Sequence, residues 1–318
     1  MLIIGFDVGG TNVRGVALRP GASEPLAIRR ARTRPDGDVL VETIVEVTNG
    51  LADDLGEPAD AVGLGMAALM DSSGVFRYAP NIPGVFNYPL VERVVERLQV
   101  PVIAENDATT ATWAEAQLGA GRGYQDMAFV ALGTGIGTGF VLGGRLHRGA
   151  HGYAGEAGHM TVQRDGPEHI TGAQGPWEYF ASGTGLGNLA RRWAAAGRLD
   201  ALVERAGSVA DIRGEYVQEL LDEGEPGIEA LIERFSHDVA IGLADLVYVL
   251  DPEVIVLGGG LVDLGETLRM HVEQSLASRI LGAQYRPAVP VVLAELGSYA
   301  GAIGAAALAA DLLDSTSE

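Results

Sequence analysis

The chain has 318 residues, with 22 basic side chains against 42 acidic ones and no cysteine. The length is enough for roughly two domains, and a 47% share of hydrophobic residues argues against an intrinsically disordered chain. The net charge of −20 disfavours binding to nucleic acid, because phosphate backbones are repelled and no basic patch stands out. Without cysteine, a disulfide, a thiolate nucleophile and a cysteine-bound metal are excluded. With no apolar run long enough for a bilayer and no recognisable signal peptide, we expect a cytoplasmic protein with no membrane partner.

Glycines cluster at the ends of apolar runs and mark two similar hairpins. The first covers residues 2–18, where two apolar runs are joined by Gly9-Gly10-Thr11. The second covers 127–142, where the join is Gly-Thr-Gly-Ile-Gly-Thr-Gly at 133–139. Two copies of one unusual hairpin predict an internally duplicated chain of two related α/β halves.

The other predicted elements alternate between helices and strands. Apolar residues at helical spacing predict helices, in chain order, at 39–56, 90–98, 108–118, 188–205, 211–222, 228–250 and 300–313. Short apolar runs predict strands at 61–66, 100–104 and 253–257. This alternation indicates a mostly parallel or mixed sheet in each half, and thus an α/β fold.

Both glycine joins are candidate phosphate sites. Glycines let backbone N–H groups approach phosphate oxygens, and an acid at the end of the preceding strand can orient a magnesium ion. The first candidate consists of Asp7, Gly9, Gly10 and Thr11; the second consists of Gly133, Thr134, Gly135 and Gly137. Gly259 and Gly260, after a third strand, could border a nucleotide base. The alternative interpretation is a pair of plain hairpin turns.

Asp107 lies where the strand 100–104 passes into the helix 108–118. A carboxylate at the end of a strand is well placed to accept a hydroxyl proton as a general base, with Asn106 orienting the same substrate. The alternative is that Asn106 or Asp107 only caps the helix. The two interpretations are compatible.

A second group of polar residues lies within glycine-rich sequence. Glu156 and His159 belong to Gly-Tyr-Ala-Gly-Glu-Ala-Gly-His at 152–159, and Glu178 follows Trp177. Small residues around Glu156 and His159 indicate a tight loop that presents one acceptor and one imidazole. An isolated histidine is more often a surface or core residue, so this pattern alone leaves both interpretations open.

In this order and spacing, these segments resemble the ROK (repressor, open reading frame, kinase) family of sugar kinases, within the actin-like ATPase superfamily. The resemblance covers nearly the whole chain. It is carried by DVGGT (7–11), PNIPGVFNYPL (80–90), ENDA (105–108), GTGIGTG (133–139), GYAGEAGH (152–159), WEYFASG (177–183) and VIVLGGG (254–260). The most similar members are bacterial glucokinases.

The resemblance implies two related actin-like (ribonuclease H-like) α/β domains around a cleft. The small domain would be residues 1–108 with the C-terminal helix at about 300–318, and the large domain residues 109–299. The two glycine loops would hold the phosphates of ATP with Mg²⁺, and Asp107 would be the catalytic base. The residues implied to surround the sugar are Asn81, Asn106, Asp107, Glu156, His159 and Glu178.

The sequence departs from the family pattern at two places. Ala67-Ala68 stands where a sugar-contacting loop usually carries Pro-Gly. The family also carries a zinc motif with three cysteines that join the histidine of the GEAGH segment. Here those positions hold His169, Thr171 and Pro176, and proline has no side-chain ligand. We therefore expect no structural zinc.

The sequence as a whole predicts an ATP-dependent hexose kinase, a glucokinase in the first place, that phosphorylates the 6-hydroxyl of glucose. The alternatives are a kinase for another hexose (fructose, mannose or an N-acetylhexosamine), a polyphosphate-dependent glucokinase, and, from a different class, a non-catalytic sugar-sensing regulator. The resemblance also implies a homodimer or homotetramer.

Overall fold

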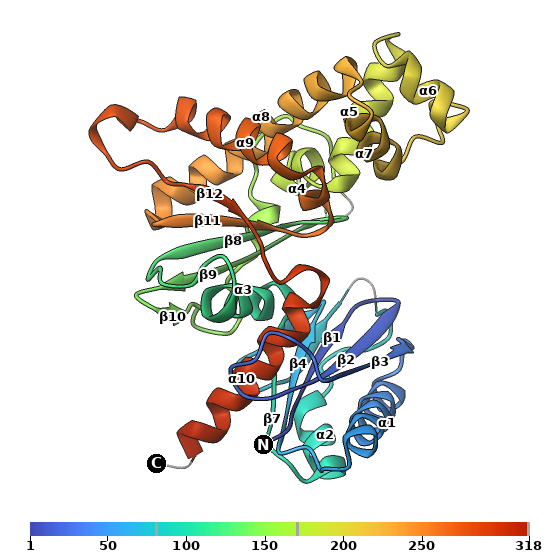
Figure 1. Cartoon of the computed structure of the whole chain (residues 1–318), viewed down its shortest axis with the longest axis vertical. Coiled ribbons are helices and arrows are strands. Elements are labelled where there is room, and N and C mark those ends of the chain that lie inside the picture. The colour runs from blue at the N-terminus through green and yellow to red at the C-terminus, as the bar shows by residue number, and fades with distance from the viewer. Residues whose placement is uncertain (80–81, 170–171, 317–318) are drawn as a thin grey trace. The chain divides into compact units, whose positions relative to one another are not determined.

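The computed structural model describes residues 1–79, 82–169 and 172–316 (Figure 1). The chain forms two compact units. Unit 1 comprises residues 1–125, 139–155 and 295–318, and unit 2 comprises residues 126–138 and 156–294. The domain bounds expected from the sequence remain a prediction.

Unit 1 contains a five-stranded mixed sheet in the order β3-β2-β1-β4-β7. Its strands are β1 (Ile3–Val8), β2 (Asn12–Leu18), β3 (Ala27–Arg32), β4 (Ala61–Met66) and β7 (Val102–Asn106). β1, β2 and β3 form an antiparallel meander, whereas β4 and β7 run parallel to β1. The carboxyl ends of β1, β4 and β7 therefore share one edge of the sheet, which is where ligands bind in open α/β sheets.

A second five-stranded sheet has the order β10-β9-β8-β11-β12. Its strands are β8 (Met127–Leu132), β9 (Ile136–Leu142), β10 (Arg145–Leu146), β11 (Val254–Gly258) and β12 (Val291–Leu293). As in the first sheet, three strands consecutive in the chain are followed by two parallel neighbours. The duplication expected from the two hairpins is confirmed, and with it the α/β fold class.

The helices of unit 1 are α1 (Gly37–Leu55), α2 (Leu90–Leu98), α3 (Asp107–Leu118) and α10 (Ala300–Thr316). α10 approaches the sheet very closely, and glycines make this possible. A Cβ atom on Gly5 of β1 would lie 2.0 Å from the carbonyl oxygen of Ala302, and one on Gly63 of β4 would lie 1.8 Å from that of Ala305. On the other face, Phe6 and Leu64 belong to a core that includes Ile44 and Leu51 of α1.

The helices of unit 2 are α4 (Trp177–Ala181), α5 (Gly183–Ala195), α6 (Asp200–Ala206), α7 (Gly214–Asp222), α8 (Pro226–Leu250) and α9 (Gly265–Arg279). The single helical segment predicted at 188–205 is in fact two helices, α5 and α6. β3, α9, β12 and the small hairpin β5 (Leu69–Met70) and β6 (Phe76–Tyr78) were not predicted. Within the described residues, no helix is both long and apolar enough to cross a membrane.

Candidate active site

The first glycine loop follows β1 and is closed by backbone and side-chain hydrogen bonds. Gly9 donates its N–H to the carbonyl of Asn12 at 3.0 Å, and its own carbonyl accepts from Thr33 Oγ at 2.6 Å. Asp7 comes just before this loop, 3.7 Å from the guanidinium of Arg14. Burial raises the pKa of Asp7, and the charge of Arg14 partly opposes this rise. A partly buried carboxylate beside a glycine loop fits a hard cation bound together with phosphate.

Asn106 and Asp107 lie at the same edge of the sheet, where β7 ends and α3 begins. Asn106 is the N-cap, because its Oδ1 accepts from the N–H groups of Ala108 (2.9 Å) and Thr109 (3.2 Å). Asp107 occupies the first turn, where its Oδ1 accepts from the N–H of Ala108 at 2.8 Å. The cap role is thus filled by Asn106, so the carboxylate of Asp107 is not needed for it.

The segment with Ala67-Ala68 connects these two sites. The N–H of Ala67 donates to the carbonyl of Val8 at 2.9 Å, and Nδ2 of Asn106 donates to the carbonyl of Ala68 at 3.4 Å. The departure from the family pattern therefore lies in direct contact with one predicted sugar-binding residue.

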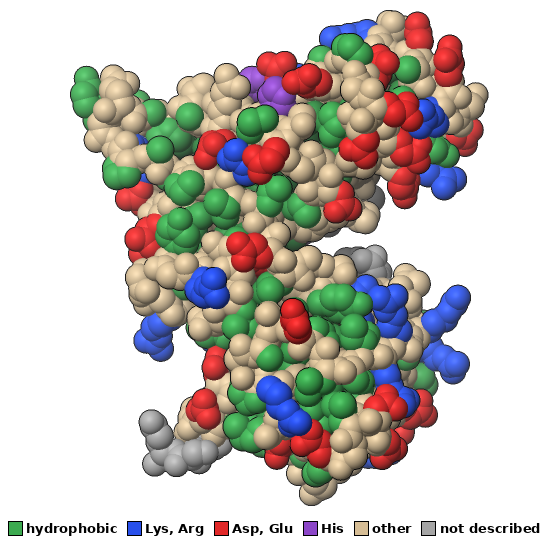
Figure 2. All heavy atoms as spheres, in the orientation of Figure 1, with side chains coloured by type: hydrophobic (Ala, Val, Ile, Leu, Met, Phe, Trp, Pro, Cys, Tyr) green, Lys and Arg blue, Asp and Glu red, His purple; other side chains and the backbone are tan. Residues whose placement is uncertain are grey.

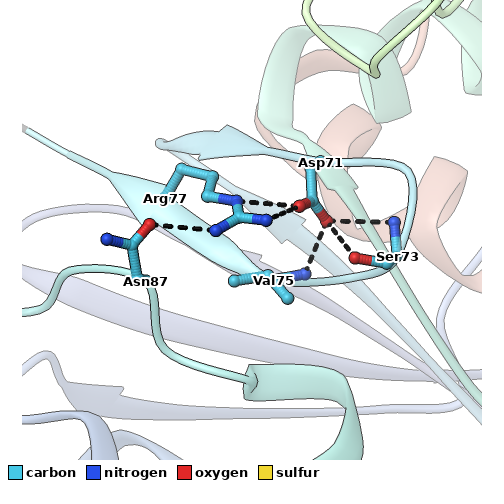
Figure 3. Close-up of polar contacts among 5 residues, drawn as sticks. All are labelled: Asp71, Ser73, Val75, Arg77 and Asn87. Carbon is cyan, nitrogen blue, oxygen red and sulfur yellow. Dashed lines mark hydrogen bonds and ion pairs between the residues drawn. The ribbon is translucent and has the colours of Figure 1, made fainter.

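Asp71 organises the hairpin that follows (Figure 3). Its Oδ1 accepts from the N–H and Oγ of Ser73 (3.0 and 2.7 Å) and from the N–H of Val75 (3.0 Å), and its Oδ2 accepts from Nε of Arg77 at 2.8 Å. Arg77 also donates to Oδ1 of Asn87 at 3.0 Å. Desolvation raises the pKa of Asp71, but the hydrogen bonds from Ser73, Val75 and Arg77 outweigh it and lower the pKa to about 2.

The second glycine loop joins β8 to β9 and is held from within unit 2. Gly133 donates to the carbonyl of Gly135 at 3.0 Å, and Gly183 at the start of α5 donates to the carbonyl of Gly133 at 2.7 Å. Oγ of Thr184 donates to the carbonyl of Thr134 at 2.8 Å. The start of a helix thus lies directly against the loop, an arrangement that favours anions.

Glu178 of α4 contacts the same loop. Its Oε2 accepts from the N–H of Ile136 at 2.7 Å, and a Cβ atom on Gly135 would lie 2.1 Å from that oxygen. Its Oε1 lies 3.3 Å from Nε2 of His169. Glu178 therefore links the second glycine loop to the segment that carries His169.

Trp177 anchors α4 beneath Glu178. Its side chain is fully buried, and its Nε1 donates to the carbonyl of Asp238 in α8 at 3.0 Å. Gly242 of α8 leaves space for the ring, since a Cβ atom there would lie 2.2 Å from Trp177.

Glu156 and His159 lie beside this group. Nε2 of His159 is 3.6 Å from Oε2 of Glu156, and the rings of His159 and His169 are 6.2 Å apart. Burial raises the pKa of Glu156, the charge of His159 lowers it, and the charge of Glu178 raises it. Unit 2 thus brings together the second glycine loop, Glu156, His159 and Glu178.

The zinc site of the ROK family pattern does not fit the residues around Glu178. One ligand atom from each of His159, His169 and Glu178 lies within 4.8 Å of the others. The carboxylate of Glu178 already accepts the N–H of Ile136, however, and the chain offers no thiolate. Pro176 begins α4 as its N-cap and has no ligand atom. A closed four-ligand site cannot be built from this set.

Of the two glycines after β11, Gly259 lies where both the backbone conformation and the neighbouring atoms require glycine. Its φ is 81°, and a Cβ atom would lie 2.5 Å from the carbonyl oxygen of Leu132. Gly260 has open space around its Cα, so packing in the protein does not explain the choice of glycine there.

Two predicted positions, Asn81 and Thr171, lie outside the described residues. Sequence reasoning missed two features. One is the contact of His169 with Glu178, which the position of His169 in place of a cysteine could have indicated. The other is the partly buried ion pair of Glu105 with Arg148, for which the sequence contains no signal, since the partners are 43 residues apart.

Comparisons with known proteins agree on one family. The model of the ROK family matches residues 3–312. A glucokinase from Streptomyces coelicolor is 34% identical over 97% of this chain and 97% of its own length. An N-acetylmannosamine kinase from Shigella flexneri is 30% identical over 97% of this chain and 98% of its own. The crystal structure of a ROK family glucokinase from Streptomyces griseus, in complex with glucose and AMPPNP, covers 98% of this chain and 100% of its own with 35% identity and a TM-score of 0.86.

Proposed function

The chain belongs to the ROK family, and we propose that it transfers the γ-phosphoryl group of ATP to the 6-hydroxyl of glucose. The observation that carries this proposal is the position of Asp107, a first-turn carboxylate at the carboxyl edge of the sheet that also presents the first glycine loop. The glucokinase relatives at 34% and 30% identity, each matched over nearly its whole length, support the same reaction.

Asp107 would be the general base. Asn106 caps α3 in its place, so the carboxylate of Asp107 can accept the proton of the sugar hydroxyl as that oxygen attacks phosphorus. Because phosphoryl transfer depends mainly on positioning and charge stabilisation, the base needs only to lie within hydrogen-bond reach of the acceptor.

The glycine loops would bind the donor. The loops at Gly9, Gly10 and Thr11 and at 133–137 bring backbone close to where phosphate oxygens would lie. The N–H groups of Gly9, Gly133 and Ile136 already donate within the protein, so their neighbours in the two loops would be the donors. Gly259 and Gly260 would border the base. The raised pKa of Asp7 fits a carboxylate placed to receive a cation. Mg²⁺ held there would supply positive charge against the phosphoryl oxygens.

The sugar would be held by Asn81, Asn106, Asp107, Glu156, His159 and Glu178. The carboxylates and the imidazole provide acceptors and a donor for sugar hydroxyls. Glu178 also accepts the N–H of Ile136 in the second glycine loop. A sugar bound to Glu178 would therefore also affect the position of that loop.

One observation favours a second candidate substrate. Ala67-Ala68 contacts Asn106 and departs from the family pattern, and a relative at 30% identity is an N-acetylmannosamine kinase. Another hexose, an N-acetylhexosamine in particular, is the alternative acceptor. We further propose a cytoplasmic homodimer or homotetramer that needs no zinc.

A coupled assay with ATP over glucose, fructose, mannose and the N-acetylhexosamines tests the proposal. We expect the highest kcat/KM with glucose and little turnover in Asp107→Asn. A higher kcat/KM with an N-acetylhexosamine would identify the alternative substrate. Sugar binding without turnover of any hexose would indicate a sensing protein and contradict the proposal.

A further inference from the structure

The ion pair of Glu105 with Arg148 differs from an ordinary surface pair. Acidic side chains are spread over the face shown in Figure 2, and a pair such as Arg93 with Glu96 joins side chains that are 53% and 55% exposed. Exposed pairs of this kind contribute little to stability. The side chain of Glu105 is only 12% exposed, and that of Arg148 is 37% exposed. The carboxylate of Glu105 thus lies largely out of water, with Arg148 as its counter-ion.

Glu105 belongs to the strand that presents the proposed base. It lies in β7 directly before Asn106 and Asp107, and it pairs in the sheet with Gly65 of β4. Nε of Arg148 donates a hydrogen bond to Oε1 of Glu105. The guanidinium of Arg148 therefore binds the residue directly before Asn106, which the proposed function places against the sugar.

Arg148 begins a short loop that leads to Glu156. The N–H of Ala154 donates to the carbonyl of Arg148 at 3.1 Å and closes this loop. We refer to residues 148–155, which all belong to unit 1, as the Arg148 loop. Because Glu156 is the next residue in the chain, the loop determines the point at which the chain reaches Glu156.

The Arg148 loop has little stiffness of its own. Three of its eight residues are glycines, and the φ angles of Gly149, Gly152 and Gly155 are 72°, 92° and 107°. Glycine adopts such conformations without strain, but it also leaves the backbone free to change conformation. Contacts with the rest of unit 1 must therefore hold the loop in place.

The middle of the loop lies against the hairpin that Asp71 organises. The N–H of Ser72 donates to the carbonyl of His151 at 3.3 Å. The next position has no room for a side chain, because a Cβ atom on Gly152 would lie 2.9 Å from the carbonyl oxygen of Met70 and 3.0 Å from the backbone nitrogen of Ser72. Backbone thus packs on backbone, and this contact holds the middle of the loop.

The ion pair holds the beginning of the loop. The side chain of Arg148 reaches the end of β7, and its planar guanidinium offers donors in a fixed fork, so it sets a direction as well as a distance. With both contacts in place, only three residues separate Gly152 from Glu156.

We propose that Arg148 is a positioning residue for the sugar site. Through Glu105 it holds the loop that leads to Glu156 on the strand that ends in Asn106 and Asp107. The proposal rests on the kinase function given above, and it gives Arg148 no contact with the sugar or with ATP. The ion pair should therefore affect sugar binding much more than ATP binding.

Loss of the guanidinium would leave the carboxylate of Glu105 largely out of water without its counter-ion, which destabilises the local arrangement. Both stretches of chain that the pair joins lead to residues proposed to bind the sugar, and a displacement of about 1 Å at such residues can cost about 10²-fold in rate. The first glycine loop is closed by its own hydrogen bonds with Asn12 and Thr33, so we expect it to keep its structure.

The test measures the KM for glucose, the KM for ATP and the melting temperature. It compares the wild type with Arg148→Gln, Arg148→Lys, Glu105→Gln and the double variant Arg148→Gln/Glu105→Gln. Arg145→Gln is the matched control, because it removes the same charge from an exposed residue of β10. If another hexose has the highest kcat/KM, that hexose replaces glucose.

In Arg148→Gln we expect the KM for glucose to rise at least about tenfold, while the KM for ATP stays within about twofold of the wild type. Arg148→Lys should recover part of the loss, because it restores the charge without the fork. Arg145→Gln should keep both KM values of the wild type.

The double variant shows whether the two residues act as one unit. In that case it should raise the KM for glucose no more than the worse of the two single variants does. The affinity for glucose without ATP, measured by calorimetry, should follow the same order among the variants.

The proposal would be overturned by an unchanged KM for glucose in Arg148→Gln together with a lower melting temperature, since a purely structural ion pair gives that result. An equal rise in the KM values for glucose and ATP, the same rise in Arg145→Gln, or effects of the two single substitutions that add up in the double variant would also overturn it. A wild type that binds glucose without turnover would instead refute the kinase function, and the calorimetric comparison would still decide on Arg148, so the two failures are distinguishable.

Discussion

Asp107 is the side chain on which the proposed reaction depends most. In Asp107→Asn the amide cannot accept the hydroxyl proton, whereas Asn106 still caps α3. We expect kcat to fall by about 10²–10⁴-fold, with little change in the melting temperature. Turnover and the affinity for a non-hydrolysable ATP analogue should be measured on the same preparation.

Asn106→Ala is the matched comparison, because it removes the cap and keeps the base. It should lower stability by about 1 kcal/mol. If Asp107→Asn lost stability and kept normal turnover, Asp107 would be a structural residue and the proposed mechanism would be wrong.

Asp71 gives a prediction about pH. Its folded-state pKa is about 2, below the ordinary value of 3.8, so the ionised form is the one that folding favours. The resulting stability is fully present above about pH 4 and is lost as the pH falls toward 2. Asp71→Asn should therefore lower the denaturation midpoint at pH 7 and make little difference near pH 2.

Asp165→Asn, at an exposed turn residue, is the control for this measurement. A constant difference between the wild type and Asp71→Asn from pH 7 to pH 2 would show that the network in Figure 3 does not depend on the charge of Asp71.

The residues of the site were predictable where the motif is local. The first glycine loop, Asn106 and Asp107 each follow a strand in the sequence, and this order alone places them at one edge of a parallel sheet. The contact of Glu178 with Ile136 joins residues 42 apart, and no local pattern encodes it.

At the scale of elements, the spacing of apolar residues was sufficient to predict the positions of most helices and strands. The strand 61–66 and the helix 90–98 have the bounds expected from the sequence. β3 was missed because its sequence, AIRRAR, is half arginine and only partly buried, so it lacks the alternation that marks a strand. α9 could have been found, since Leu268, Val272 and Leu276 are buried at helical spacing.

The packing of α10 on the sheet depends on glycine at positions where a methyl group has no room. In Gly63→Ala the new Cβ atom would meet the backbone of Ala305 at 1.8 Å, and backbone cannot move aside as a flexible side chain can. We expect a loss of stability of about 1–3 kcal/mol or more, measured by chemical denaturation.

Gly214→Ala is the control for this substitution. Gly214 begins α7, and a Cβ atom there meets nothing within 4 Å, so alanine should be neutral or stabilise the helix by up to about 1 kcal/mol. Equal stability of Gly63→Ala and the wild type would mean that α10 does not pack on β4 as described.

At the scale of the whole molecule, both sheets follow one plan. A hairpin with a glycine loop begins each sheet, and two parallel strands complete it. Repetition of a rare local pattern was the signal that revealed this plan. The sequence could not reveal how the second half holds the segment around Glu178, because the cysteines that would identify a metal site are absent.

Metal content is the property in which we expect this chain to differ most from relatives that carry the cysteine motif. A structural zinc site needs four protein ligands in a tetrahedron, whereas His159, His169 and Glu178 offer three ligand atoms within 4.8 Å of one another and the chain has no thiolate to complete the set. Glu178 accepts a hydrogen bond from the N–H of Ile136 and lies close to His169. The fully buried side chain of Trp177 holds α4, the helix that carries Glu178. We expect these protein contacts to hold the segment without zinc.

We therefore expect the purified protein to contain far less than one zinc per chain, and to recover full activity after chelation when Mg²⁺ alone is returned. Elemental analysis before and after chelation, with hexose kinase assays on both samples, provides the measurement. His169→Gln serves as the comparison. If the contact of His169 with Glu178 holds the segment, this variant should raise the KM for the sugar in metal-free buffer. One tightly held zinc per chain, with activity lost on its removal and restored only by zinc, would show that the three side chains form a metal site.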